Sequence, residues 1–324
     1  MGILPLLEAD ALEITILVDN QIDALLAGEE QVRRNPWDRS VRNPFLDGSG
    51  PGLATLRAEH GFSALVTVVR DGERHTLLFD TGVSPDGMIE NMDRLQLDPK
   101  DVEAVVLSHG HADHTAGLAG FAERLGRTNM PVLAHRLAFT RRRSAPPQGE
   151  PVLLPPPSRS AIEGAGFEVI ESDDPSLLFH DALLLTGEVP RATEFEQGFP
   201  FFQRESGSGW EPEPHLMDDQ ALVANVKGKG LVVLTGCGHA GIVNIVTRAK
   251  QATGVDSVHA VMGGFHLPGA FFEPLIPLVV DRLRHFEPKL LVPAHCTGYK
   301  AQQAMAAAMP DAYVQNAVGT TYLF

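Results

Sequence analysis

The chain has 324 residues, of which 44% are hydrophobic and 21% charged, and its formal net charge is −15. This composition predicts a folded globular protein with a sizeable core. The acidic balance opposes binding to nucleic-acid backbones, and the two cysteines, Cys237 and Cys296, are too few for a disulfide framework.

The N-terminal segment Met1–Asn20 lacks the basic start and apolar core of a signal peptide and instead carries Glu8, Asp10 and Glu13. No apolar run in the chain is long enough to span a bilayer. We therefore expect a cytoplasmic protein that binds neither membranes nor nucleic acids.

The first half of the chain predicts strands and then an alternation of strands and helices. We expect strands over 14–18, 63–69, 75–80 and 104–107, and helices over 88–95 and 118–125. The pair Asp71-Gly72 separates the second and third strands, which predicts a hairpin turn.

The middle of the chain contains two expected loop insertions, at about 141–160 and 195–218. The first is dense in proline, and we expect irregular structure there because proline is excluded from helix interiors and central strands. The second mixes aromatic residues with glycine, serine and proline. That mixture favours a loop that covers the substrate or contacts a second copy of the chain in a homodimer.

The second half repeats the early pattern. We expect strands over 221–226, 231–234, 258–262 and 290–292, and helices over 242–250 and 275–286. Together the halves predict an α/β fold in a single domain, residues 1–324. Two sheets would pack face to face with helices on both outer sides, which is a four-layer αββα sandwich.

A cluster of metal-ligand side chains directly follows the predicted strand 104–107. It contains His109, His111, Asp113 and His114. Imidazole and carboxylate ligands suit zinc, iron or manganese, and such a site is catalytic when it keeps one coordination position open. The cluster therefore predicts a metal site at the end of a strand.

Three later strands end in the same way, with a glycine or proline stop before a ligand-type residue. The first supplies Cys237 and His239, the second His266, and the third His295 and Cys296. Strand ends hold functional groups on rigid supports. We therefore expect one site that is assembled from both halves of the chain.

These motifs resemble the metallo-β-lactamase superfamily. The stretch His109–His114 resembles its signature, and Leu78–Gly82 is similar to its preceding strand, whose aspartate, here Asp80, supports the metal-binding histidines. Further segments are similar to the branch of 7,8-dihydropterin-6-ylmethyl-4-(β-D-ribofuranosyl)aminobenzene 5′-phosphate synthases, namely 16–20, 59–63, 235–244, 263–267 and 295–298.

The resemblance implies the metallo-β-lactamase fold with one or two divalent metal ions at the edge between the two sheets. His109 and His111 would bind the first metal, and Asp113 and His114 would bind the second. Zinc is the first expectation, and iron and manganese are the alternatives.

Two more ligand positions follow from the same resemblance. Cys237 falls where the superfamily usually has a bridging aspartate, and His295 falls where the last histidine of the second metal is expected. Cys237 has the alternative of being a small buried filler. The third histidine of the first metal stays open between His239, His266 and His215.

The remaining histidines divide into two sets. His60, together with Asn20, is a candidate for lining the pocket. The others are expected at ordinary surface or packing positions, namely His75, His135, His180, His259 and His285.

The expected function is that of a metal-dependent, hydrolase-like enzyme acting on a small phosphorylated or pterin-like molecule. It would use a water activated by the metal, or it would displace diphosphate from a pterin methyl carbon as a pterin-linked transferase. Asp113 would accept a proton from the water, and His266 would protonate the leaving group.

Three alternatives remain at this point. The chain could be a di-iron oxidoreductase of the same fold, or a non-catalytic ligand-binding or regulatory member. A nuclease is disfavoured by the net charge of −15 and by the absence of a basic groove pattern.

Overall fold

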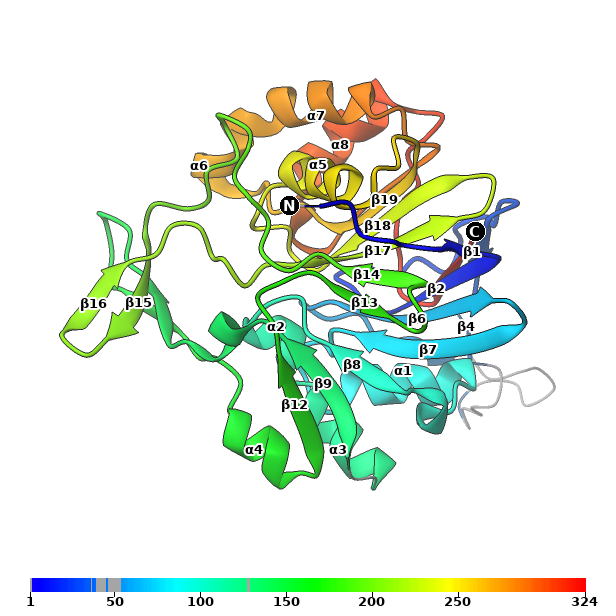
Figure 1. Cartoon of the computed structure of the whole chain (residues 1–324), viewed down its shortest axis with the longest axis horizontal. Helices are drawn as coiled ribbons and strands as arrows, with labels where there is room; N and C mark the ends of the chain where they lie inside the picture. Colours follow the sequence, from blue (N-terminus) through cyan, green and yellow to red (C-terminus); the bar gives the residue numbers. More distant parts are fainter. Residues whose placement is uncertain (1, 36, 39–44, 46–53, 127–128) are drawn as a thin grey trace.

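Two large sheets lie face to face, with helices on both outer sides (Figure 1). The computed structural model describes residues 2–35, 37–38, 45, 54–126 and 129–324. The predicted αββα sandwich is confirmed.

The first sheet has the strand order β12-β9-β8-β7-β6-β2-β21-β3. Its strands are β2 (Ala11–Val18), β3 (Val32–Arg34), β6 (Ser63–Arg70), β7 (Glu73–Phe79), β8 (Ala104–Val106), β9 (Met130–Ala134), β12 (Phe167–Glu171) and β21 (Thr320–Leu323). Helices α1 (Gly87–Leu95) and α3 (Leu118–Leu125) cover its outer face. A separate two-stranded sheet pairs β4 (Trp37–Asp38) with β5 (Ala54–Thr55).

The second sheet has the order β13-β14-β17-β18-β19-β20, with β1 (Glu8–Ala9) beside β17. The other strands are β13 (Ser176–Leu178), β14 (Leu183–Leu185), β17 (Ala221–Val226), β18 (Gly230–Thr235), β19 (Val258–Gly264) and β20 (Leu290–Ala294). Its outer face is covered by α5 (Ile242–Thr253), α7 (Ile276–His285) and α8 (Tyr299–Ala308). The short elements are α2 (Ala112–Thr115), α4 (Arg159–Gly164), α6 (Gly269–Phe272) and the 3-10 turns η1 (Pro99–Asp101), η2 (Arg136–Phe139), η3 (Glu273–Leu275) and η4 (His295–Thr297).

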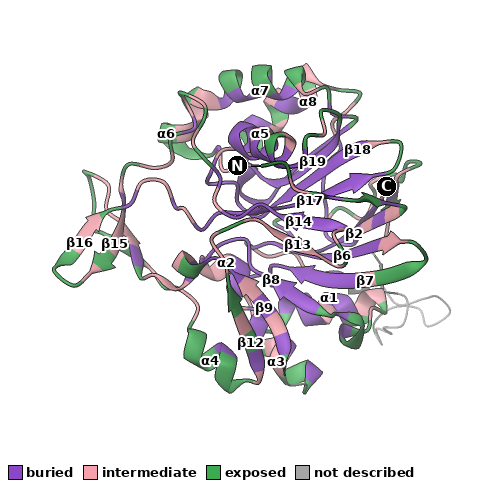
Figure 2. Ribbon diagram, in the orientation of Figure 1, coloured by how far each residue is buried: buried purple, intermediate pink, exposed green. Residues whose placement is uncertain are grey.

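The central strands of both sheets are largely buried, whereas β12 and the start of β7 are partly exposed (Figure 2). Leu77 and Phe79 point into the core between the sheets, whereas Leu78 packs beneath α1 and α3. In the second sheet, Leu234 faces the inter-sheet core and Val233 packs against the helices. Burial on both sides explains why these strands read as continuous apolar runs rather than as alternating patterns.

The two expected loop insertions contain strands that pair with each other. Strands β10 (Arg142–Ser144), β11 (Val152–Leu154), β15 (Phe202–Ser206) and β16 (Gly209–Pro212) form a four-stranded sheet, which we call the covering sheet. The expectation of irregular structure throughout 141–160 was wrong. All six prolines there lie outside the paired residues of β10 and β11, and Arg142 pairs with both Leu154 and Arg204. Strands β15 and β16 project from one end of the sandwich (Figure 1).

No helix within the described ranges combines the length and the apolar character needed to cross a bilayer.

Candidate metal centre

The candidate ligand residues meet at one edge of the sandwich because neighbouring strands end there. Strands β7 and β8 run parallel in the first sheet, and β18, β19 and β20 run parallel in the second. The carboxyl ends of parallel strands share an edge. His109 follows β8, Cys237 follows β18 and His295 follows β20, while α2 adds Asp113 and His114.

The first donor group consists of His109, His111 and His239, whose ligand-type atoms all lie within 4.8 Å of one another. Nδ1 of His111 lies 3.2 Å from Nε2 of His239. Burial lowers the pKa of His111 to about 4, and it lowers the pKa values of His109 and His239 well below the usual range. The three imidazoles are therefore neutral at neutral pH, which is the form that binds metals.

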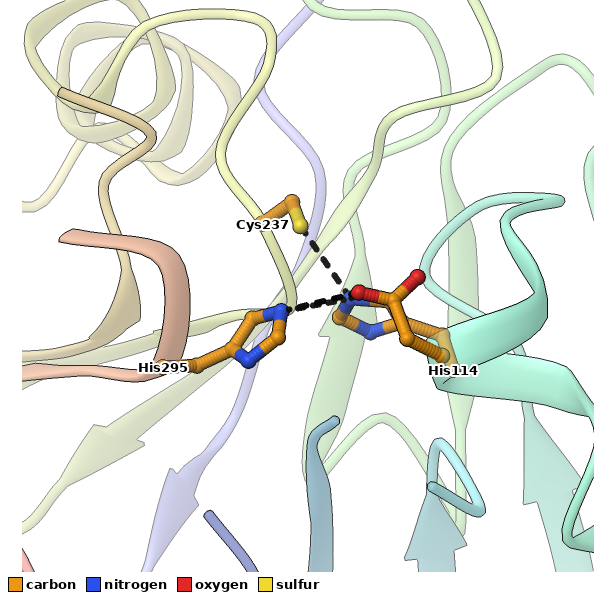
Figure 3. A group of neighbouring side chains, drawn as sticks. His114, Cys237 and His295 are labelled. Carbon is orange, nitrogen blue, oxygen red and sulfur yellow. Dashed lines mark hydrogen bonds and ion pairs between the residues drawn. The ribbon is translucent and has the colours of Figure 1, made fainter. Parts of the chain in front are cut away.

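The second donor group consists of Asp113, His114, Cys237 and His295, again with all donor atoms within 4.8 Å (Figure 3). Nε2 of His114 lies 3.1 Å from Sγ of Cys237 and 3.2 Å from Nε2 of His295. Oδ2 of Asp113 lies 3.3 Å from Nε2 of His295. Figure 3 shows His114, Cys237 and His295 converging on one point from three separate segments.

Two side chains behind the second donor group fix its histidine rings. Nδ1 of His114 lies 2.7 Å from Oδ2 of Asp80, and Nδ1 of His295 lies 3.1 Å from Oδ1 of Asn20. Both partner oxygens are acceptors, so each Nδ1 carries the proton. The lone pairs on the two Nε2 atoms therefore point toward each other and toward the thiol of Cys237.

The buried side chain of Ser108 sets the ring of His109. The hydroxyl of Ser108 donates to Asp80 and lies 2.9 Å from Nδ1 of His109, so it accepts a hydrogen bond from that nitrogen. Nε2 of His109 then carries a lone pair, and this atom is buried with no hydrogen-bond partner among the described residues. An unsatisfied buried acceptor is costly, and a bound cation would satisfy it.

The second donor group favours positive charge. Burial alone would lower the pKa of His114, but the carboxylates of Asp113 and Asp80 outweigh it and raise that pKa to about 9. A divalent cation would take the place of the proton that His114 otherwise holds, and imidazoles, a carboxylate and a thiolate are the donors that tetrahedral zinc sites use. The residues therefore fit one or two divalent metal ions.

His266 lies beside both donor groups, and His215 does not. His266 forms a group with Cys237 and His239 within 4.8 Å, and its ring centroid is 4.1 Å from that of His239. Its Nδ1 is buried and has no hydrogen-bond partner in the described part of the chain. The carbonyl of His215 instead accepts from Arg191, and His215 belongs to none of the donor groups found among the described residues.

A buried charge network lies behind His109 and His111 that the sequence did not predict. Asp218 accepts a hydrogen bond from the Gly110 amide at 2.9 Å and pairs with Arg142 at 2.9 Å. Arg142 also pairs with Glu213 at 2.7 Å. Because Arg142 belongs to β10, the network ties the covering sheet to the loop that carries the histidines. The charges of these residues alone suggest exposed positions. The one sequence signal for burial is that Asp218 lies just before the apolar strand predicted over 221–226.

Two further buried carboxylates hold the segment that follows β18. Glu196 accepts hydrogen bonds from the amides of Val243 (3.1 Å) and Asn244 (2.9 Å) at the start of α5. Asp219 accepts from the amide of Ala240 at 2.9 Å. Burial raises the pKa of each carboxyl group to about 7.

A cavity of about 660 Å³ opens above the donor groups, which is a volume typical of small-molecule sites. Asn20 and His60 line it, as predicted, together with His266. The covering sheet and the residue after β11 contribute Phe202 and Pro155. No lysine or arginine is found among the described residues of its wall.

The chain is similar in sequence to known proteins. The sequence profile of the Metallo-beta-lactamase superfamily matches residues 61–246. A 7,8-dihydropterin-6-methyl-4-(beta-D-ribofuranosyl)-aminobenzene-5′-phosphate synthase of Methanocaldococcus jannaschii is 31% identical over 251 residues, which cover 76% of this chain and 83% of that protein. An uncharacterized protein of the same organism is 31% identical over 246 residues, covering 75% and 86%.

Among solved structures, a metal-dependent hydrolase of the beta-lactamase superfamily superposes with a TM-score of 0.68. The two chains are 23% identical, and the match covers 96% of this chain and 98% of the other. This likeness supports the fold.

Proposed function

Because the chain belongs to the metallo-β-lactamase superfamily, we propose that it is a metal-dependent enzyme that transforms a small molecule in the cavity above the two donor groups. The observation that carries this proposal is the convergence of seven ligand-type side chains from both halves of the sandwich on two adjacent points. A cluster that only stabilises the fold would not need a cavity of this size directly above it, whereas a catalytic site does.

The two donor groups support two metal positions. His109, His111 and His239 would hold one ion, and Asp113, His114 and His295 would hold the second. Cys237 belongs to the second donor group and also forms a group with His239 and His266 within 4.8 Å, so it would be a ligand near both donor groups. A thiolate favours zinc or iron over magnesium, and we take zinc as the first choice.

Such ions, when bound, would lower the pKa of a coordinated water and stabilise a negatively charged leaving group. The chain's own residues supply the proton transfers. Asp113 faces the cavity beside His60, with 3.6 Å between Oδ2 and Nε2, and is placed to accept a proton from the nucleophile. His266 lines the cavity wall, and its imidazole would donate a proton to the leaving group.

The cavity favours a flat heterocyclic substrate with an anionic arm. Phe202, His60 and His266 offer ring faces to a heterocycle. Because the described wall has no lysine or arginine, the charge of a phosphate or diphosphate would be met by the metal positions. The synthase relative suggests a pterin substrate. In that reaction an aminobenzene nucleophile would form a bond to the pterin methyl carbon, and the bond between that carbon and diphosphate would break. The nucleophile would release a proton.

The test combines metal analysis with product analysis. The purified chain should retain one or two zinc ions, and His111→Ala should lose metal and activity while it stays folded. Incubation with 6-hydroxymethyl-7,8-dihydropterin diphosphate, with and without a phosphoribosyl aminobenzene, distinguishes a coupled product from simple hydrolysis. A matched control is His285→Ala, which removes an exposed histidine far from the donor groups.

Full activity in His111→Ala would overturn the proposal of metal-dependent catalysis. Two retained irons with a visible absorption band would instead favour the di-iron oxidoreductase.

A further inference from the structure

A second cluster of metal-ligand side chains joins the two sheets at the other end of β7. It consists of Glu73, His75 and His180, whose ligand-type atoms all lie within 4.8 Å of one another. Glu73 begins β7, whereas Asp80, which supports the candidate metal centre, directly follows its last residue. The length of the strand places the two sites roughly 20 Å apart.

His75 is oriented as metal-binding histidines are. Its Nδ1 lies 3.0 Å from Oε2 of Glu103, and a carboxylate only accepts, so Nδ1 carries the proton and Nε2 carries a lone pair. Glu103 is itself fixed because it accepts from the amide of Thr76 at 3.0 Å. Nε2 of His75 is buried without a hydrogen-bond partner among the described residues, and it lies 3.8 Å from Oε2 of Glu73.

Two acceptors that face each other repel unless a cation lies between them. A carboxyl oxygen of Glu73 and the lone pair of His75 form such a pair, and Nε2 of His180 lies 4.0 Å from the same oxygen of Glu73. The arrangement therefore has a place for a positive charge. Arg70, a cation near this group, pairs with Asp71 at 2.9 Å and donates to the carbonyl oxygen of His180 at 3.5 Å.

The turn that carries His180 has an unusual backbone. Phe179, His180 and Asp181 have φ angles of 51°, 54° and 64°, in the left-handed region that residues other than glycine rarely adopt. This conformation brings the ring of Phe179 onto His75, with centroids 4.8 Å apart and an interplanar angle of 6°. Strain of this kind concentrates at functional sites.

The cluster around His135 has a different hydrogen-bond pattern. His135 lies near Asp173 and Glu188, but its Nδ1 accepts a hydrogen bond from the amide of Leu137. Its Nε2 must therefore carry the proton, and it faces Asp173 at 3.3 Å. This histidine has no lone pair to offer at Nε2, whereas His75 has one.

We propose that Glu73, His75 and His180 bind a zinc-like divalent cation and so connect the first sheet to the turn between β13 and β14. Two imidazoles and a carboxylate are a common zinc donor set, with water in the fourth position. Tetrahedral zinc requires donor atoms about 3.3 Å apart. The exposed side chains of Glu73 and His180 can close the remaining distance without moving the backbone.

The test counts zinc with the candidate metal centre already loaded. The full chain is dialysed against buffered free Zn²⁺, and bound zinc per chain is measured by mass spectrometry. The parent chain should bind one equivalent more than His180→Asn and Glu73→Gln. Asparagine tolerates the left-handed backbone of position 180, so that variant should fold. His285→Asn, which removes another exposed histidine, should bind as much zinc as the parent.

A second measurement addresses the role of Glu103. Glu103→Gln should weaken binding of the extra equivalent by roughly 10- to 100-fold, because it no longer fixes the ring of His75. The extra zinc should raise the thermal unfolding temperature of the parent but not that of His180→Asn. Equal zinc content in the parent and His180→Asn would overturn the proposal, and it is also the result expected if His75 is merely protonated between its carboxylates.

Discussion

Glu196 provides a quantitative test of the buried charges behind the candidate metal centre. It is 7% exposed, and both of its carboxyl oxygens accept amide hydrogen bonds at the start of α5. Burial raises its pKa from 4.5 to about 7. The folded chain therefore holds this proton more tightly than the unfolded chain does.

The sign of the effect on stability follows from this difference. The contribution of Glu196 to the free energy of unfolding is fully present below pH 4.5 and is lost as the pH rises through about 7. The interval between the two pKa values corresponds to about 3 kcal/mol. Glu196→Gln mimics the protonated form at every pH, so its stability relative to the parent should rise by about that amount across the interval.

The assay is urea unfolding followed by circular dichroism at several pH values between 4 and 8, with both chains stripped of metal. The informative quantity is the difference between variant and parent, because the titration of other groups cancels in it. Glu194→Gln removes an exposed carboxylate from the same segment and serves as the matched control. A difference for Glu196→Gln that stays constant across this range, or that changes in the opposite direction, would refute the reasoning.

Three further predictions concern the candidate metal centre. Gly110→Ala should destabilise the chain by roughly 1–3 kcal/mol in thermal unfolding, because its Cβ would lie 2.0 Å from the carbonyl oxygen of Ala138; an unchanged unfolding temperature would contradict the close approach. Asp80→Asn should weaken metal binding by roughly 10- to 100-fold in a chelator competition, because the carboxylate that orients His114 is lost; parental affinity would argue against that role. Cys237→Ser should remove the thiolate-to-metal absorption of the cobalt-substituted chain, and persistence of that band would mean that the thiol is not a ligand.

The sequence alone predicts that most of the candidate metal ligands lie at one edge of the fold. Strand ends that carry His109, Cys237 and His295 could be recognised locally, and parallel strands share an edge. The sequence could not choose between His239 and His266, because β18 and β19 are neighbours and both residues follow at that same edge. The 3.2 Å approach of His239 to His111 depends on how the two sheets pack.

Long-range pairing explains what the sequence analysis missed. The covering sheet pairs Arg142 with Arg204, and neither segment shows a strand pattern strong enough to overcome its prolines and glycines. The burial of Asp218 and Glu196 was missed for a related reason. A charged residue is usually exposed, and only the tertiary contacts with backbone amides reveal that these carboxylates are buried.

The buried pairing of Arg142 with Asp218 and Glu213 has a consequence for redesign. Exchanging the covering sheet for that of a relative is an obvious route to a new specificity, since it forms part of the cavity wall. Replacing only the hairpin that carries Arg142 with one that lacks this arginine would leave Asp218 and Glu213 buried without their cation. The free energy of unfolding would then fall by about 3–5 kcal/mol. The segment that carries Arg142 and the segment that carries Glu213 and Asp218 therefore have to be exchanged together, although they are far apart in the chain. A library of variants must change both at once.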